Sequence, residues 1–183
     1  MKHIMIDLET LGVGHNVPIF EIGLTVFDLP ANGLPPLQLE MTSKQIDVDI
    51  MDVMWRTGFC PQPGTLDWWR TQQYDPSKTR LVDRVSLSDA LSETVRVFRE
   101  FEPEFVWANS PSFDLVILEQ HFAAVGMKKP WTYKQELDWR TLKWLARQHG
   151  FVLPDGGPNH KAVDDSDRQT EILKEMLRHV RTL

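Results

Sequence analysis

The sequence predicts an α/β fold in which a mixed β-sheet is flanked by helices. Short apolar runs typical of strands dominate the N-terminal part, and helical patterns alternate with a short strand from Ser86 onward. Strands first and helix–strand alternation afterwards are typical of a mixed sheet covered by helices. The length of 183 residues, without repeats or an obvious linker, favours one domain over residues 1–183.

The first three strands are expected to form an antiparallel meander. His3–Ile6 is a short apolar run, and Phe20–Phe27 is rich in β-branched and aromatic residues. Residues 31–33, Ala-Asn-Gly, supply turn chemistry, and apolar residues then alternate over 37–41 as a third strand.

The middle of the chain contains few regular patterns before a well-marked helix. Residues 43–84 are Pro-rich and irregular, with one short helical candidate at Leu66–Gln72. Ser86 and Asp89 form a capping-box pattern with Ser86 as N-cap. This pattern opens an amphipathic helix whose buried face carries Leu91, Val95 and Phe98.

The C-terminal half alternates a strand with helices. Phe105–Ala108 is expected to be a short buried strand, and residues 113–125 the helix that follows it. Further helices are expected at 140–149 and 164–181. The last buries a face made of Ile172, Leu173, Met176, Leu177 and Val180.

Composition excludes several classes of protein. With 42% hydrophobic and 25% charged residues the chain is typical of a soluble globular protein, and no apolar run approaches the roughly 20 residues of a membrane span. The N-terminus lacks a secretory-signal pattern, and the single Cys60 excludes an intrachain disulfide and fits a reducing cytosol. A net charge of −6 argues against a protein that coats long nucleic acid electrostatically.

Asp7 and Glu9 end the first apolar run two residues apart. Side chains at i and i+2 of a strand point to the same face, so the two carboxylates project together. Their repulsion would raise one pKa unless a cation lay between them, and Mg²⁺ and Mn²⁺ prefer such hard oxygen ligands. Taken alone, the pair also fits a strand that ends in two solvated acids.

Two further clusters carry acidic residues. The strand ending at Ala108 leads into a loop of Asn, Ser and Pro, after which Asp114 stands in the first turn of a helix, where the macrodipole favours an acid in any case. His160 lies five residues before Asp165, at the mouth of the last helix. Alone, these residues also fit a loop histidine and helix-capping acids.

Together the three clusters resemble the DEDDh exonucleases, which have the ribonuclease H-like fold. The resemblance rests on the order Asp-x-Glu, Asn-x-x-x-Phe-Asp and His-x-x-x-x-Asp, and covers nearly the whole chain. Within that group it is similar to small bacterial and phage 3′–5′ exonucleases of the ribonuclease T kind, with Trp68, Trp69 and the stretch 131–141 as further matches. Relatives usually carry Arg where this chain has Leu137, whereas Arg140 and Thr141 match.

The resemblance implies a five-stranded ribonuclease H-like sheet and a two-metal hydrolase. Asp7, Glu9, Asp114 and Asp165 would hold two Mg²⁺ ions, for which Mn²⁺ would substitute, about 3.5–4 Å apart. Asp7 would bridge the ions, Glu9 and Asp165 would hold the nucleophile's ion and Asp114 the other. His160 would be the general base, because an imidazole accepts protons near neutrality. Nucleoside 5′-monophosphates would leave from a free 3′ end.

The resemblance also implies a substrate site and partners. Thr10, Leu11 and Gly12 would contact the terminal nucleotide, with Leu11 against a base, and Trp68 or Trp69 would offer a stacking surface. An amphipathic helix with one Trp turned inward fits the Trp pair as well. The expected partners are 3′ ends of single-stranded DNA or RNA and a second copy of the chain in a homodimer, in the cytoplasm of a bacterium or as a phage product.

Two other functions remain open at this point. A nuclease-fold module that binds nucleic acid without catalysis would not need the five catalytic positions that this chain carries. A hybrid nuclease that cuts internally gives no reason for His160 at its spacing from Asp165. DNA and RNA are not separated, because the residue that would contact the 2′-OH cannot be located.

Overall fold

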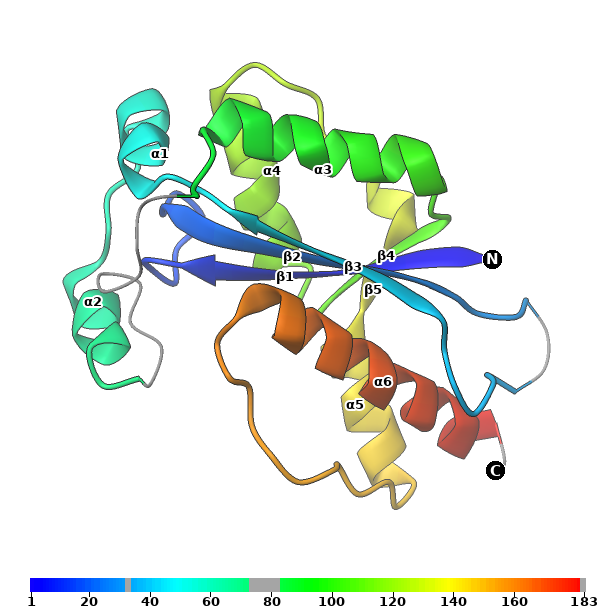
Figure 1. The fold of residues 1–183 in the computed structure, drawn as a ribbon. Coiled ribbons are helices and arrows are strands. Elements are labelled where there is room, and N and C mark those ends of the chain that lie inside the picture. Colours follow the sequence, from blue (N-terminus) through cyan, green and yellow to red (C-terminus); the bar gives the residue numbers. More distant parts are fainter. Residues whose placement is uncertain (32–33, 73–82, 182–183) are drawn as a thin grey trace.

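The computed structural model describes residues 1–31, 34–72 and 83–181 (Figure 1). Its strands form one five-stranded sheet in the order β3-β2-β1-β4-β5. The strands are β1 (Lys2–Thr10), β2 (Ile19–Asp28), β3 (Met41–Asp47), β4 (Phe105–Ala108) and β5 (Glu136–Asp138). The helices are α1 (Ile50–Thr57), α2 (Pro63–Trp69), α3 (Leu87–Phe101), α4 (Asp114–Ala124), α5 (Trp139–Gln148) and α6 (Ala162–Arg181), with a short 3-10 turn at Tyr133–Gln135.

The predicted mixed sheet is confirmed. β1 pairs antiparallel with β2, and β2 pairs antiparallel with β3, which gives the expected meander. β4 joins the other edge of β1 in parallel, and β5 pairs in parallel with β4. The carboxyl ends of three neighbouring parallel strands therefore meet at one edge of the sheet, where loop residues can converge on a site.

Helices cover both faces of the sheet (Figure 1). α3 and α4 pack on one face, where Leu91, Leu115 and Leu118 join the larger apolar core. α5 and α6 pack on the other face, where Trp139, Leu173 and Met176 form a second core with Met5 and Phe27 of the sheet. Each strand of the centre is thus buried on two sides, which explains the nearly continuous apolar runs of β1 and β2.

The third strand was predicted in the wrong segment. β3 begins at Met41, opposite Phe27, and not around residue 37. Leu37 is 80% exposed, whereas Leu39 is buried against the second core. β3 lies at the edge of the sheet, so its sequence is largely polar and lacks the alternation that marks a half-buried strand. Two residues of the predicted turn, 32 and 33, lie outside the described residues.

The segment predicted as irregular contains an additional helix. α1 starts after Asp49, whose carboxylate accepts the backbone N–H groups of Met51 and Asp52, and ends at Gly58 in a left-handed conformation. The predicted helix at 66–72 is instead α2, which starts earlier because Pro63 is favourable at a first helical position. The predicted helix cap is confirmed: the Ser86 hydroxyl accepts the Asp89 N–H at 3.2 Å.

None of the helices in the described part of the chain combines the length and the apolar character that a membrane crossing requires.

Candidate active site

Four carboxylates from three elements line one cavity of about 220 Å³ at the carboxyl edge of the parallel strands. Asp7 and Glu9 lie on the same face of β1, Asp114 opens α4 and Asp165 lies in the first turn of α6. β1 runs on to Thr10, so the first two carboxylates lie inside the strand and not beyond its end. The structure thus brings together all four acidic residues that the sequence singled out.

His160 joins the cavity from the loop between α5 and α6. Its backbone is held in the left-handed region, with φ 61°, and its N–H donates to Asp165 Oδ2 at 2.9 Å. The N–H of Asn159 donates to the other oxygen of Asp165 at 3.1 Å. Asp165 therefore fixes the loop that presents His160, which is a physical reason for the five-residue spacing.

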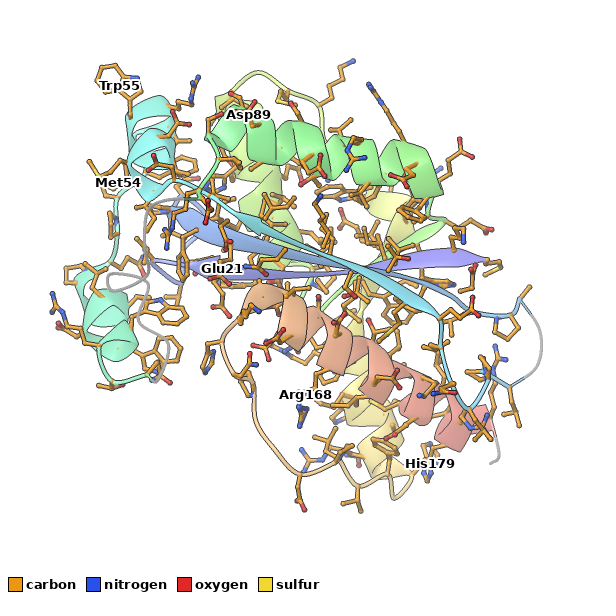
Figure 2. All side chains as sticks on the ribbon, in the orientation of Figure 1. Glu21, Met54, Trp55, Asp89, Arg168 and His179 are labelled. Carbon is orange, nitrogen blue, oxygen red and sulfur yellow. The ribbon has the colours of Figure 1, made fainter. Side chains whose placement is uncertain are left out.

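Two side chains further hold this loop. The ring of His160 meets the ring of Trp68 edge to face, with centroids 4.8 Å apart. From α6, the guanidinium of Arg168 donates to the backbone carbonyls of Pro154, Asp155 and Gly156 (Figure 2). Arg168 thus holds the loop before His160, and Trp68 contacts the His160 ring itself.

The start of α6 lies directly against β2 beneath the site. A Cβ at Gly23 would lie 2.1 Å from the carbonyl oxygen of Ala162, so only glycine permits this approach. The carboxylate of Glu21, which is 1% exposed, accepts the N–H of Ala162 at 3.1 Å, and Gln45 accepts the N–H of Val163 (Figure 2). These side chains satisfy the free N–H groups of the helix start and place Asp165 over β1.

The carboxylates are poorly solvated and repel one another. Burial raises the pKa of Glu9 to about 10, with further contributions from Asp7, Glu21, Asp165 and Asp114. Burial, followed by the charge of Asp114, holds the pKa of Asp7 well above its usual range, and burial raises that of Asp165. Burial raises the pKa of Asp114 to about 7, although backbone hydrogen bonds and the charge of Arg140 act in the opposite direction. The cavity therefore favours protons or cations as counter-charges.

We expect the stability of the metal-free protein to fall as pH rises. Above about pH 5 the unfolded chain has released its carboxyl protons, whereas the folded state keeps those of Glu9 and Asp114 until about pH 10 and 7. The folded state then binds more protons, so the free energy of unfolding decreases with pH across this window. Thermal unfolding in EDTA should show it, and Mg²⁺ should remove most of the decrease. A melting temperature in EDTA that rises with pH would contradict the expectation.

The donor set fits divalent cations. Glu9, His160 and Asp165 each offer one ligand atom, and these atoms all lie within 4.8 Å of one another. The side-chain oxygens of Asn109 and Gln169, which also line the cavity, are buried and have no hydrogen-bond partner. Carboxylate and amide oxygens are the ligands that Mg²⁺ and Mn²⁺ prefer, so this cluster could bind such an ion.

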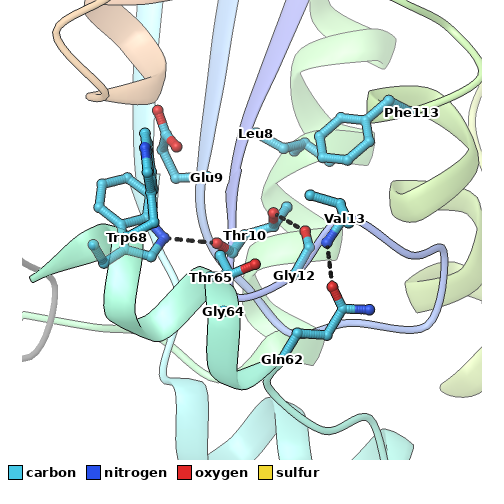
Figure 3. A pocket seen from close by; sticks show the side chains of 11 residues that line it. Leu8, Glu9, Thr10, Gly12, Val13, Gln62, Gly64, Thr65, Trp68 and Phe113 are labelled. Atoms are coloured by element: carbon cyan, nitrogen blue, oxygen red, sulfur yellow. Dashed lines mark hydrogen bonds between the residues drawn. The ribbon is translucent and has the colours of Figure 1, made fainter.

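A second, mainly apolar cavity of about 590 Å³ adjoins the acidic one (Figure 3). The two share Leu8, Glu9 and Phe113. Thr10, Gly12, Trp68 and Trp69 line the apolar cavity, so the structure brings these predicted substrate residues together. Its size lies within the ordinary range of small-molecule pockets.

Leu11 does not line the apolar cavity. Its side chain is buried with Phe20 and Trp69, its N–H donates to Pro18 and its carbonyl accepts Gln62. The expectation that Leu11 lies against a base is therefore not met by the structure, because the chain reverses direction at this point and the side chain faces the core. Gly12 is required here, since a Cβ would lie 2.4 Å from Cγ1 of Val17.

The two tryptophans differ in environment. Trp69 is 2% exposed and donates from its indole N–H to the carbonyl of Thr10 at 2.9 Å, which ties α2 to the end of β1. Trp68 is 41% exposed and faces both His160 and the apolar cavity. Of the pair, only Trp68 offers an accessible ring.

A family model described as the 3′-5′ exoribonuclease Rv2179c-like domain matches residues 2–177. The chain belongs to this family. It is therefore a 3′–5′ exonuclease domain, and nucleic acids are its substrates. No curated protein matched the sequence.

Solved structures of two exonucleases have a similar fold. The nuclease domain of 3′hExo, a DEDDh family member bound to rAMP, matches with a TM-score of 0.61 at 15% identity, over 97% of this chain and 92% of that one. E. coli Exonuclease I in complex with a dA16 oligonucleotide matches with a TM-score of 0.61 at 14% identity. The match covers 99% of this chain and 41% of the Exonuclease I chain. The Rv2179c-like domain thus has the ribonuclease H-like fold of the DEDDh exonucleases.

Several residues of the site in this Rv2179c-like domain had no role assigned from the sequence. Gln169 lies one helical turn after Asp165 and donates to Asp7 Oδ1 at 2.7 Å, so its spacing was a usable signal. Asn109 and Arg140, which stand in stretches that carried the resemblance but received no role there, also line the cavity, and Glu21 lies buried opposite Glu9 in the sheet register. Leu137, where relatives usually carry Arg, packs against the second apolar core from β5.

We expect Gln169→Leu to weaken metal binding and activity about 10- to 100-fold. Removal of a residue that hydrogen-bonds to a metal-binding carboxylate and orients it has effects of this size. The change removes the donor to Asp7 while keeping a side chain of similar volume. Titration of activity with Mn²⁺ should show a raised half-saturating concentration with partial recovery at excess metal. Unchanged metal dependence would show that Asp7 needs no support from Gln169.

Proposed function

We propose that this domain is a metal-dependent exoribonuclease that releases nucleoside 5′-monophosphates from the 3′ end of single-stranded RNA. The observation that carries the proposal is the convergence of four carboxylates and His160 on one cavity that opens into an apolar pocket. The pocket is suited to a terminal nucleoside and the acidic cavity to its phosphate, once cations offset the charge.

Asp7, Glu9, Asp114 and Asp165 would hold two Mg²⁺ or Mn²⁺ ions. When bound, such ions lower the pKa of an attacking water and stabilise the charge on the scissile phosphate and the leaving 3′ oxygen. Gln169 orients Asp7, and the N–H groups of Asn159 and His160 orient Asp165. The protein thus holds the ligand set rigid before substrate arrives.

His160 would take the proton from the attacking water. Its side chain lines the acidic cavity. A ring nitrogen of His160 lies within 4.8 Å of a carboxylate oxygen of Glu9 and of one of Asp165. The edge contact with Trp68 restricts the orientation of the ring. A side chain placed in this way is suited to general base catalysis.

The terminal nucleoside would lie in the apolar pocket between Phe113 and Trp68. Leu8, Val13 and these two aromatic side chains supply contact area without base-specific donors, which suits removal of successive different nucleotides (Figure 3). The hydroxyl of Thr10 is engaged with the carbonyl of Gly12 at 2.7 Å and shapes the wall of the pocket.

RNA is the proposed substrate because the family is described as an exoribonuclease domain. The test is degradation of matched 5′-labelled single-stranded RNA and DNA with Mg²⁺, with products resolved by length. A ladder that shortens from the 3′ end, faster for RNA, is the expected result. Internal fragments would favour the hybrid nuclease, and binding without cleavage would favour the non-catalytic module.

We also propose a homodimer that forms through α1. Met51 and Trp55 are 67% and 87% exposed and lie one turn apart on this helix, where Trp55 projects away from the sheet (Figure 2). Aromatic and Met side chains are enriched in interface cores. Sedimentation at micromolar concentration should show a dimer that Trp55→Asp disrupts. A cytoplasmic location belongs to the same proposal, because Cys60 is a free, exposed thiol.

A further inference from the structure

A groove along α5 adjoins the acidic cavity. It is lined by Arg140, Lys143, Trp144, Arg147 and Gln148 and has a volume of about 400 Å³. Arg140 lines both the groove and the acidic cavity. The acidic cavity therefore has the apolar pocket as one neighbour, through Glu9 and Phe113, and the groove as the other, through Arg140.

The groove residues form one stripe of the helix. Positions 140, 143, 144 and 147 are three or four residues apart and lie on the same face. From Arg140 to Arg147 the helix rises about 10 Å, at 1.5 Å per residue. The helix itself is anchored, because Trp139 is buried and donates from its indole N–H to the carbonyl of Gln169 at 2.9 Å. The stripe therefore has a fixed position relative to the catalytic carboxylates.

The basic side chains of the stripe take part in no ion pair within the described residues. Within the described ranges no carboxylate forms an ion pair with Arg140, Lys143 or Arg147, whereas Lys129, for example, is paired with Glu119 and Glu136. Lys143 lies over the ring of Trp139, 4.6 Å from its centroid. Burial lowers the pKa of Lys143, and the charges of Arg140 and Arg147 lower it further, although the charge of Asp138 acts in the opposite direction. Arg140 faces the carboxylates of the acidic cavity, whereas Lys143 and Arg147 lie outside that cavity and are available to an anionic ligand.

An aromatic ring stands in the middle of these cations. Trp144 is 62% exposed and lies between Lys143 and Arg147 on the lining of the groove. Basic residues that follow a backbone, together with an exposed aromatic ring, are the elements by which proteins hold single-stranded nucleic acid. An acidic polypeptide would satisfy the charges, but in a nucleic acid every residue also supplies a flat base that can stack on the indole ring.

We propose that Lys143, Trp144 and Arg147 form a binding track for the RNA strand on the 5′ side of the scissile phosphate. The two cations contact phosphates and Trp144 stacks on a base. The direction of the strand rests on the proposed function: with the 3′ nucleoside in the apolar pocket and its phosphate in the acidic cavity, the preceding nucleotides leave past Arg140 onto α5. The track makes the enzyme prefer strands longer than a dinucleotide.

The track is tested by equilibrium binding of a 5′-fluorescein 16-nucleotide oligoadenylate in EDTA, over a range of salt concentrations. The Lys143→Ala/Arg147→Ala double variant should reduce the slope of log affinity against log salt by about 1.4, since each phosphate contact on a single strand contributes about 0.7. Trp144→Ala should weaken binding about fivefold or more with little change in slope. The milder double variant with Gln in both positions should repeat the slope change if the alanine variant is unstable.

The matched control removes two cations from the opposite face of the sheet. Arg96 and Arg99 are exposed on α3, so Arg96→Ala/Arg99→Ala causes the same change in net charge and should leave slope and affinity unchanged. An equal effect of both double variants would overturn the track, because it would reduce the result to net charge. Polyglutamate that competes as well as oligoadenylate would also overturn it.

Hydrolysis supplies a second readout. In the Lys143→Ala/Arg147→Ala variant the ratio of kcat/KM for the 16-mer to that for a dinucleotide should fall about 10-fold, mainly through KM. An unchanged ratio with intact hydrolysis would contradict the track and leave the proposed function standing. If the wild-type protein cleaves neither substrate, the proposed function fails, and the binding measurements in EDTA still decide whether the groove holds RNA.

Discussion

Replacing Asp7 with Asn is expected to reduce turnover by at least about 10³-fold while the fold survives. Asp7 lines the acidic cavity and its charge interacts with those of Asp114 and Asp165. Loss of cation binding there removes several kcal/mol of transition-state stabilisation, and each 1.36 kcal/mol is about tenfold in rate. Its amide keeps the shape of the side chain. Because Asp7 is repelled by Asp114 and Asp165, the melting temperature in EDTA should stay level or rise.

Asp164→Asn is the matched control for this change. Asp164 precedes Asp165, but its carboxylate faces Lys161 and accepts from the Asn159 side chain, outside the acidic cavity. This variant should keep nearly the wild-type rate. Single-turnover cleavage of end-labelled RNA with saturating Mg²⁺ measures both. A near wild-type rate for Asp7→Asn would show that the reaction takes place elsewhere on the molecule.

His160→Ala is expected to lower kcat by about 10² to 10⁴-fold with little change in the affinity for RNA. A neutral imidazole can accept a proton from water, whereas an imidazolium cannot. The wild-type rate should therefore fall toward acid pH, and this limb should flatten or move in the variant. His149→Ala, at the exposed end of α5, serves as the control.

The position of His160 also allows a different role. Its nitrogen lies within 4.8 Å of ligand atoms on Glu9 and Asp165, so the ring could serve as a metal ligand. In that case excess Mn²⁺ would restore the variant to the full rate and the acid limb would be unchanged. Such a rescue would contradict the assignment of His160 as the base, whereas a rate that stays low at saturating metal would support it.

The sequence by itself determined the features that depend on neighbours within one turn or one strand. The i, i+2 spacing of Asp7 and Glu9 placed both on one face of β1, and the Ser86 and Asp89 pattern located the start of α3. The strand Phe105–Ala108 and the helix after it were found within one residue, and the order of the acidic motifs indicated the family. In each case the signal lies in residues that are close along the chain.

Tertiary structure decided what depends on residues far apart. The edge strand β3 was misplaced because an edge carries polar side chains, and only its partner β2 defines it. The bond from Gln169 to Asp7 spans 162 positions, and the burial of Trp69 rather than Trp68 depends on how α2 packs against the end of β1. Periodicity reports which face of an element is apolar but not which element covers it, so the partners of these side chains emerge only when the sheet and its helices have packed together.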